Sequence, residues 1–157
     1  MEDRPTRLYS PGVRRWMVWS LVAVVLVVAT IGGVAIYRKA TYGTRYGEAQ
    51  QNVTTSVDSV FTLVVPDRGP SVGDYWTAFA DDPALAEQVR STLIADNVID
   101  RWFGPAIGGG AGQRLITFRA KTAGTTTITL TNCFQGCDNE RKRAESRTVS
   151  WRVTVER

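Results

Sequence analysis

An uncharged apolar stretch near the N-terminus constrains the fold of this chain of 157 residues more than any other feature. Residues 16–37 read WMVWSLVAVVLVVATIGGVAIY and contain no charged side chain. As a helix rising about 1.5 Å per residue they span about 33 Å, enough for one bilayer crossing. Trp16, Trp19 and Tyr37 lie towards the ends of the stretch, where aromatic rings favour the membrane interface. We therefore predict one transmembrane helix over residues 16–37.

A cleaved signal peptide is the main alternative for this stretch. Its apolar region is usually about 7 to 15 residues long and ends at a small-residue cleavage site. Here the run is longer and leads into Arg38 and Lys39, so we favour an uncleaved anchor. Residues 1–15 are then a cytoplasmic tail, although the positive-inside bias between the two flanks is small.

The charged residues exclude several classes of function. Residues 1–46 hold seven basic and two acidic side chains, whereas residues 47–157 hold twelve and thirteen, so the C-terminal part has no net basic charge for nucleic acid. There is no histidine, which removes Ser-His-Asp and Cys-His catalysis and histidine-containing zinc sites. Asp74, Asp81 and Asp82 are the nearest approach to a cation site, but Asp82 is explained as a helix cap. We therefore expect that the protein is not an enzyme and that it binds neither a cofactor nor a metal ion.

The two cysteines indicate in which cellular compartment the C-terminal part of the chain lies. Cys133 and Cys137 are the only ones and enclose Phe-Gln-Gly, a pair too small to complete a tetrahedral zinc site. A disulfide between them needs an oxidising compartment, and the alternative is two reduced thiols. We predict the disulfide and place the C-terminal part outside the cytoplasm, which makes the chain a single-pass plasma-membrane protein. Sixteen Arg against three Lys indicates a GC-rich genome, such as a bacterial one.

The sequence after the apolar stretch predicts a stalk followed by a β domain. Residues 38–56 are polar and lack a sustained apolar period, which is typical of a stalk. Residues 57–157 then form the predicted domain. Five strand regions with turn residues between them indicate an all-β sandwich or small barrel: 57–65, 75–79, 115–120, 125–131 and 148–156.

One helix is predicted within this β domain. Asp82-Pro83 is a helix-start signal, and Leu85, Val89 and Leu93 recur every four residues after it. The expected product is a short helix, or a helical turn leading into a strand near 94–103. Trp76 and Trp151 are large and flanked by strand formers, so we expect both in the core.

Two motifs resemble the chagasin-type inhibitors of papain-like cysteine peptidases, an immunoglobulin-like β-sandwich family. One is the glycine-rich run with two strands that spans residues 108–130, GGGAGQRLITFRAKTAGTTTITL. The other is Pro-Ser-Val-Gly-Asp-Tyr-Trp at residues 70–76, which matches the family's loop at its proline, glycine and tryptophan. The resemblance covers residues 57–156 and implies the same fold, anchored by one N-terminal transmembrane helix.

The resemblance also implies three partner-binding loops at one end of the sandwich. The central loop is Gly69–Trp76, the glycine loop is Gly108–Gly112, and the cysteine loop is Cys133–Cys137. The family's third loop carries Arg-Pro-Trp, which this chain lacks, so Phe134 is the candidate substitute anchor. The implied contact residues are Pro70, Ser71, Val72, Gly73, Asp74, Trp76, Gly108, Gly109, Gly110, Gly112, Phe134 and Gln135.

The function implied is reversible, noncovalent occlusion of a papain-like cysteine peptidase. The alternative is a non-catalytic accessory subunit or interaction module of an integral membrane protein complex, which keeps the fold and changes the loop tips. The absent Arg-Pro-Trp favours the alternative, and the retained proline-to-tryptophan and glycine loops favour the inhibitor.

Overall fold

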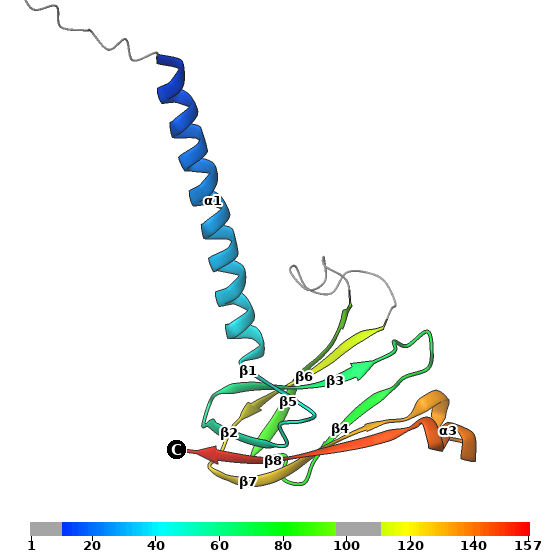
Figure 1. Cartoon of the computed structure of the whole chain (residues 1–157). Helices are drawn as coiled ribbons and strands as arrows, with labels where there is room; N and C mark the ends of the chain where they lie inside the picture. The colour runs from blue at the N-terminus through cyan, green and yellow to red at the C-terminus, as the bar shows by residue number, and fades with distance from the viewer. Residues whose placement is uncertain (1–10, 97–110) are drawn as a thin grey trace, which may run out of the picture. The chain divides into compact units, whose positions relative to one another are not determined.

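The N-terminal part of the chain is one long helix. The computed structural model describes residues 11–96 and 111–157, and they fall into an N-terminal unit and a second unit that spans Arg38–Arg157. Helix α1 covers Pro11–Tyr42 (Figure 1). Its segment Arg15–Tyr42 has a mean hydropathy of 2.4 and is long and apolar enough to cross a membrane. Its large apolar side chains between Trp16 and Ile36 are mostly exposed.

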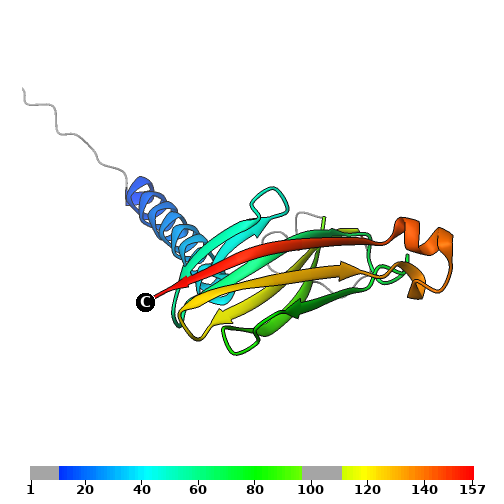
Figure 2. The same ribbon diagram turned by 90° about the horizontal axis from the view of Figure 1, so that it is seen from below.

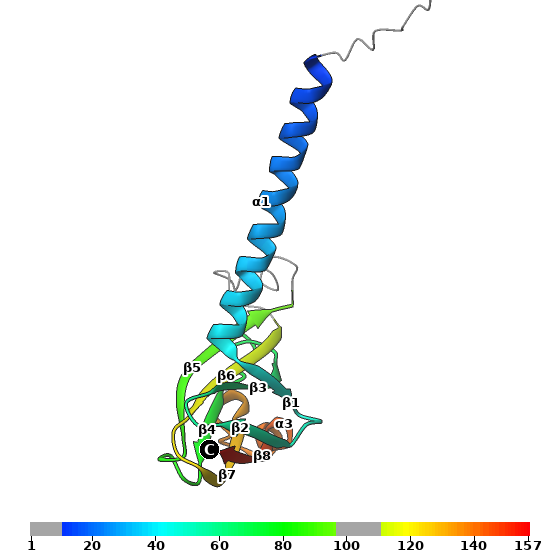
Figure 3. The same cartoon turned by 90° about the vertical axis from the view of Figure 1, so that its left-hand side faces the viewer.

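The second unit is a sandwich of two sheets, seen as separate layers in Figures 1 and 3. One sheet has the order β1-β3-β6-β5 and the other β2-β8-β7-β4. β1 pairs parallel with β3 and β2 with β8, and the remaining neighbours are antiparallel. The strands are β1 (Thr44–Gly47), β2 (Asn52–Ser56), β3 (Val60–Asp67), β4 (Trp76–Ala80), β5 (Ala86–Ala95), β6 (Gly112–Ala120), β7 (Gly124–Asn132) and β8 (Arg147–Glu156).

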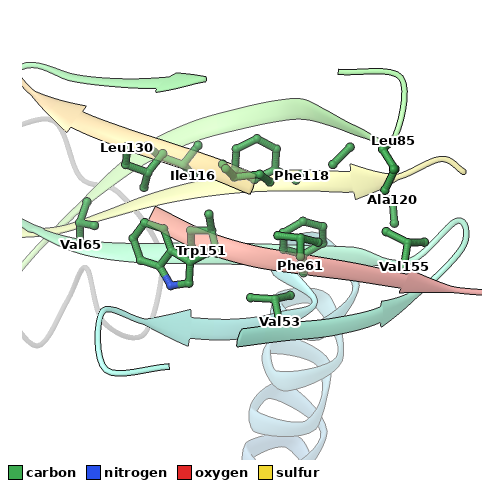
Figure 4. Close-up of a cluster of buried hydrophobic side chains, with 14 of the residues drawn as sticks. Val53, Phe61, Val65, Leu85, Ile116, Phe118, Ala120, Leu130, Trp151 and Val155 are labelled. Atoms are coloured by element: carbon green, nitrogen blue, oxygen red, sulfur yellow. The ribbon is translucent and has the colours of Figure 1, made fainter. Parts of the chain in front are cut away.

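The core lies between the two sheets because the strands alternate inward and outward side chains. In β7, Thr126, Ile128 and Leu130 are buried, whereas the threonines between them face outward. Trp151 is fully buried and Trp76 is 8% exposed, so both expected core tryptophans are confirmed. Figure 4 shows Phe61 and Phe118 within the same cluster, and their rings stack with centroids 5.6 Å apart. The five strand regions expected from sequence are confirmed as β3, β4, β6, β7 and β8.

The predicted stalk over residues 38–56 is wrong. The segment contributes the last turn of α1, β1 and β2, and both strands pair with core strands. Tyr42 is buried, and its carbonyl oxygen accepts a hydrogen bond from Thr62 Oγ1 at 2.6 Å. Gly43 then ends the helix at φ 58°, where a Cβ would lie 1.6 Å from the carbonyl oxygen of Val60. Short polar edge strands lack the apolar runs that sequence patterns detect.

The predicted helix after Asp82 is also wrong. Asp82 does bond to the Ala84 N–H at 2.9 Å, but this cap serves a single turn. The chain continues as β5, which pairs antiparallel with β6 around a bulge between Gln88 and Arg90. Val89 is 47% exposed, so the four-residue spacing does not mark a buried helix face. Pairing with β6 overrides the local signal, and residues 97–103 of the suggested strand lie outside the described residues.

Candidate functional site

The central and cysteine loops meet at one end of the sandwich. The central loop joins β3 to β4, and the cysteine loop leaves β7 and leads to the short helix α3 (Glu140–Glu145) before β8. Trp76 and Asn132 are register partners, which places the start of β4 beside the end of β7. Figures 1 and 2 both show α3 and the β3–β4 turn at this end, which we call the loop end.

The backbone of the central loop is fixed by its own hydrogen bonds. Gly69 and Gly73 have φ of 95° and 99°, values that favour glycine. The N–H of Val72 donates to the Gly69 carbonyl and that of Gly73 to the Pro70 carbonyl, each at 3.1 Å. The Asp67 carboxylate accepts from the Gly69 N–H at 2.6 Å. The loop therefore holds one shape.

The tip of this loop is exposed. Pro70, Ser71 and Val72 face solvent, and Val72 is 43% exposed. Asp74 and Trp76, expected as contacts, are instead buried at 3% and 8% exposure. Asp74 and Trp76 are therefore not exposed to a partner, whereas the tip formed by Pro70, Ser71 and Val72 is.

The cysteine loop is bonded to the central loop. Cys133 and Cys137 form the predicted disulfide around a short 3₁₀ turn, η1 (Phe134–Gly136). The Gln135 N–H donates to the Gly73 carbonyl at 2.8 Å, and its side-chain amide donates to the Val72 carbonyl at 3.3 Å. Exposed Gln135 therefore lies beside the exposed tip, and the two loops are in contact.

Phe134 does not serve as an exposed anchor. Its ring is buried at 8% exposure, beneath the guanidinium of Arg68, whose carbon lies 4.4 Å from the ring centroid. The Phe134 N–H donates to Ser146 Oγ at 3.0 Å, which ties the turn to the residue after α3. Phe134 therefore packs the loop end from inside and does not replace the missing tryptophan at a partner surface.

An ion pair crosses the base of the central loop. Arg68 Nη2 donates to Asp74 Oδ1 at 2.7 Å, and the Arg68 backbone N–H donates to Oδ2 at 2.8 Å. Burial raises the pKa of the Asp74 carboxyl, but the bonds from Arg68 outweigh this and hold it below its ordinary value. The bond to Asp74 in turn raises the pKa of Arg68 further above its usual range. Both groups stay charged at neutral pH.

The described part of the glycine loop is structural. Gly112 faces Asp67 across the β3–β6 ladder, and a Cβ there would lie 2.1 Å from the Ile94 carbonyl oxygen. Close packing of β5 on β6 thus explains this glycine. Buried Asp67 pairs with Arg114 Nε at 2.7 Å. Gly108, Gly109 and Gly110 lie outside the described residues.

A hollow of about 440 Å³ opens at the loop end. Its lining is mostly polar or charged: Pro66, Asp67, Arg68, Asp74, Asp96, Ala111, Gly112, Asn132, Glu145 and Arg147. Three of its carboxylates, those of Asp67, Asp74 and Glu145, are already paired with arginines. Within residues 11–96 and 111–157, no group of three His, Cys, Asp or Glu is placed to hold a metal ion. Asp74 precedes β4 whereas Asp81 and Asp82 follow it, so that strand separates the three aspartates.

Sequence reasoning missed two exposed aromatic side chains beside the loop end. Phe79, on the outward face of edge strand β4, is 67% exposed, and Tyr75, immediately before that strand, is 69% exposed. The alternation of side chains along a strand could have predicted them, because an inward Trp76 places its odd-numbered neighbours on the outward face. Tyr75 adjoins the tip directly, since its carbonyl accepts from the Cys133 N–H at 2.9 Å.

The fold matches solved structures of low sequence similarity. No protein-family model and no curated protein matches the chain. A cysteine protease inhibitor from Entamoeba histolytica is similar, with a TM-score of 0.55 and 16% identity over 72% of this chain and 95% of that one. The solution structure of amebosin is also similar, with a TM-score of 0.52 and 17% identity over 72% and 97%. The expected immunoglobulin-like β-sandwich is confirmed, and the Entamoeba histolytica structure that shares it is that of a cysteine protease inhibitor.

Proposed function

We propose that this chain is a membrane-anchored inhibitor that reversibly blocks papain-like cysteine peptidases. The observation that carries the proposal is the bonding of the central and cysteine loops into one tip. That tip stands at the end of a sandwich whose fold is shared with a cysteine protease inhibitor. The family resemblance assigns the same loops to the peptidase cleft.

The inhibition is occlusion, without a covalent step. Pro70, Ser71 and Val72 enter the cleft and exclude substrate. Because hydrogen bonds already hold their backbone, little conformational freedom is lost on binding, which favours affinity. The amide of Gln135 supports the tip from behind through the Val72 carbonyl.

The contact must extend beyond the tip. A stable interface buries about 800 Å² on each partner, more than three residues supply. Exposed Tyr75 and Gln135 adjoin the tip and widen the contact surface. Gly108, Gly109 and Gly110 remain expected contacts by resemblance.

The proposed setting is the outer face of the plasma membrane. Helix α1 is the anchor, residues 1–15 are cytoplasmic, and the disulfide requires an oxidising compartment for the domain. The first strand begins at Thr44, so few residues separate the apolar helix from the domain. The target peptidase is then one that acts close to that membrane. The alternative of an accessory subunit in a membrane complex finds no support in the fold comparisons.

A matched pair of serine variants tests the proposal. Ser71→Arg places a long charged side chain at the exposed tip, whereas Ser56→Arg places it at the exposed end of β2, beside Glu156. With full chain in mild detergent, we expect Ser71→Arg to weaken inhibition of a papain-like peptidase at least about 100-fold, the loss of a well-packed contact. Ser56→Arg should inhibit like wild type. Equal inhibition by all three proteins would refute the assignment of the tip.

A further inference from the structure

Arg68 stands where three parts of the loop end converge. It follows β3, and its side chain reaches Asp74 at the end of the central loop, the ring of Phe134 in η1, and Glu145 of α3. The most distant of these partners, Glu145, is 77 positions from Arg68 in the sequence. One guanidinium therefore connects the central loop, the cysteine loop and α3.

The contact with Asp74 differs from an ordinary surface ion pair. The Asp74 side chain is only 2% exposed, and it accepts bonds from Nε, Nη2 and the backbone N–H of Arg68. A buried carboxylate that loses such a partner is left uncompensated, which is costly. The pair therefore fixes where the two ends of the central loop lie.

The contacts of Arg68 with Phe134 and Glu145 connect the central loop to the cysteine loop and to α3. The guanidinium lies over the buried face of Phe134, an arrangement that favours a planar cation. Arg68 Nη1 also donates to Glu145 Oε2 of α3 at 3.1 Å. The planar fork of arginine satisfies all three partners together, which a lysine ammonium does not.

We propose that Arg68 is the positioning residue of the tip: it holds the central loop against the cysteine loop so that Ser71, Val72 and Gln135 face a peptidase in one arrangement. This inference rests on the proposed inhibitory function. It also accounts for the absent Arg-Pro-Trp motif. Here an arginine from the neighbouring loop and a buried phenylalanine organise the end of the sandwich from within, and the exposed tip supplies the contact.

Hydrogen exchange and inhibition kinetics test the role of Arg68 in the full chain in mild detergent. In Arg68→Ala we expect the amides of Gly73 and Gln135 to exchange at least about 10-fold faster, because both donate within the loop end. Amides of Ile128 and Leu130 in the core should keep their rates. Association with the peptidase should slow at least about fivefold, since the tip must order on binding.

Three further variants give the controls. Arg68→Lys keeps the positive charge and the aliphatic part of the side chain but loses the planar guanidinium. It should therefore accelerate hydrogen exchange at the amides of Gly73 and Gln135 at least about threefold. Glu145→Gln removes only the exposed partner and should have little effect. Arg152→Ala removes an exposed arginine from β8 and should change neither readout.

The outcomes separate this inference from the proposed function. Unchanged exchange at Gly73 and Gln135 in Arg68→Ala, or full rescue by Arg68→Lys, would overturn the positioning role. If Arg68→Ala does not fold, Arg68→Lys decides the question by the same exchange measurement. If wild type inhibits no peptidase while the exchange result is as expected, the function fails and the role of Arg68 in ordering the loops stands.

Discussion

The backbone N–H of Gln135 donates to the carbonyl oxygen of Gly73 at 2.8 Å, which joins two loops that the sequence separates by most of the domain. A side chain on Gly73 would disturb this contact, because its Cβ would lie 2.5 Å from Gln135 Cγ. The relationship makes Gly73 the residue through which the two loops can be uncoupled.

Gly73→Ala should therefore weaken inhibition more than Gly136→Ala. Both glycines have positive φ, 99° and 89°, so each substitution should cost about 1–2 kcal/mol of unfolding free energy. Of these two glycines, only Gly73 has a neighbour within 4 Å of the added methyl group in the part of the chain that the structure describes. Inhibition constants for the two variants, compared at matched folded concentration, measure the difference. An equal loss in both would show that backbone strain alone matters.

Asp74→Asn should lower the unfolding free energy by about 1–2 kcal/mol at neutral pH, because charge-assisted bonds from Arg68 are weakened. The Asp74 carboxyl has a folded pKa below its ordinary value of 3.8. Its stabilising contribution is thus present above pH 3.8 and is lost as pH falls through the folded pKa. Chemical unfolding of wild type and variant across this range should show the two free energies converging in acid. A constant difference would contradict the pairing.

Trp151→Phe should destabilise the domain more than Trp76→Phe. Trp151 Nε1 donates to the Gly47 carbonyl at 3.2 Å, and its side chain is fully buried. Trp76 Nε1 is buried and has no hydrogen-bond partner among residues 11–96 and 111–157, so its removal relieves an unmet donor. We expect a difference of about 1–2 kcal/mol in unfolding free energy between the variants. The reverse order would mean that the Trp76 donor has a partner in solution.

The disulfide gives a test of location and of loop stability. In native membranes, a membrane-impermeant thiol reagent should not label the full chain until a reductant is added, and labelling should then occur at both cysteines. Replacing Cys133 and Cys137 by serine should lower the unfolding free energy by about 2 kcal/mol, the chain-entropy estimate for so small a ring. Free thiols in untreated membranes would contradict the extracytoplasmic placement.

Sequence patterns predicted the parts of the fold that repeat regularly. The apolar run predicted the helix, and the strand-forming runs at residues 125–131 and 148–156 predicted β7 and β8. The edge strands β1 and β2 were not predicted, because they are short and polar and are ordered by pairing with β3 and β8. β5 was mistaken for a helix because Asp82 provides a cap that only one turn uses.

The two loops of the site could be predicted from the sequence, whereas the buried contacts between them could not. The proline-to-tryptophan motif and the cysteine pair located the two loops that the structure brings together. Nothing in the spacing of Arg68, Asp74 and Phe134 showed that they would meet, since their contacts depend on how β3, β4 and β7 end side by side. Phe134 and Asp74 were expected as contacts because the family resemblance placed them in partner-binding loops, and partners brought in by the fold buried both.

The most direct test is titration of the full oxidised chain, in mild detergent, into a papain-like cysteine peptidase while substrate hydrolysis is followed. The account predicts loss of peptidase activity at one inhibitor per enzyme, with a Kd in the nanomolar range, about −12 kcal/mol of binding free energy. Activity should return when the chain is diluted or removed, since no covalent bond forms. Full peptidase activity at about 10 µM inhibitor, a concentration at which even weak specific complexes form, would contradict the central claim if it held for several such peptidases.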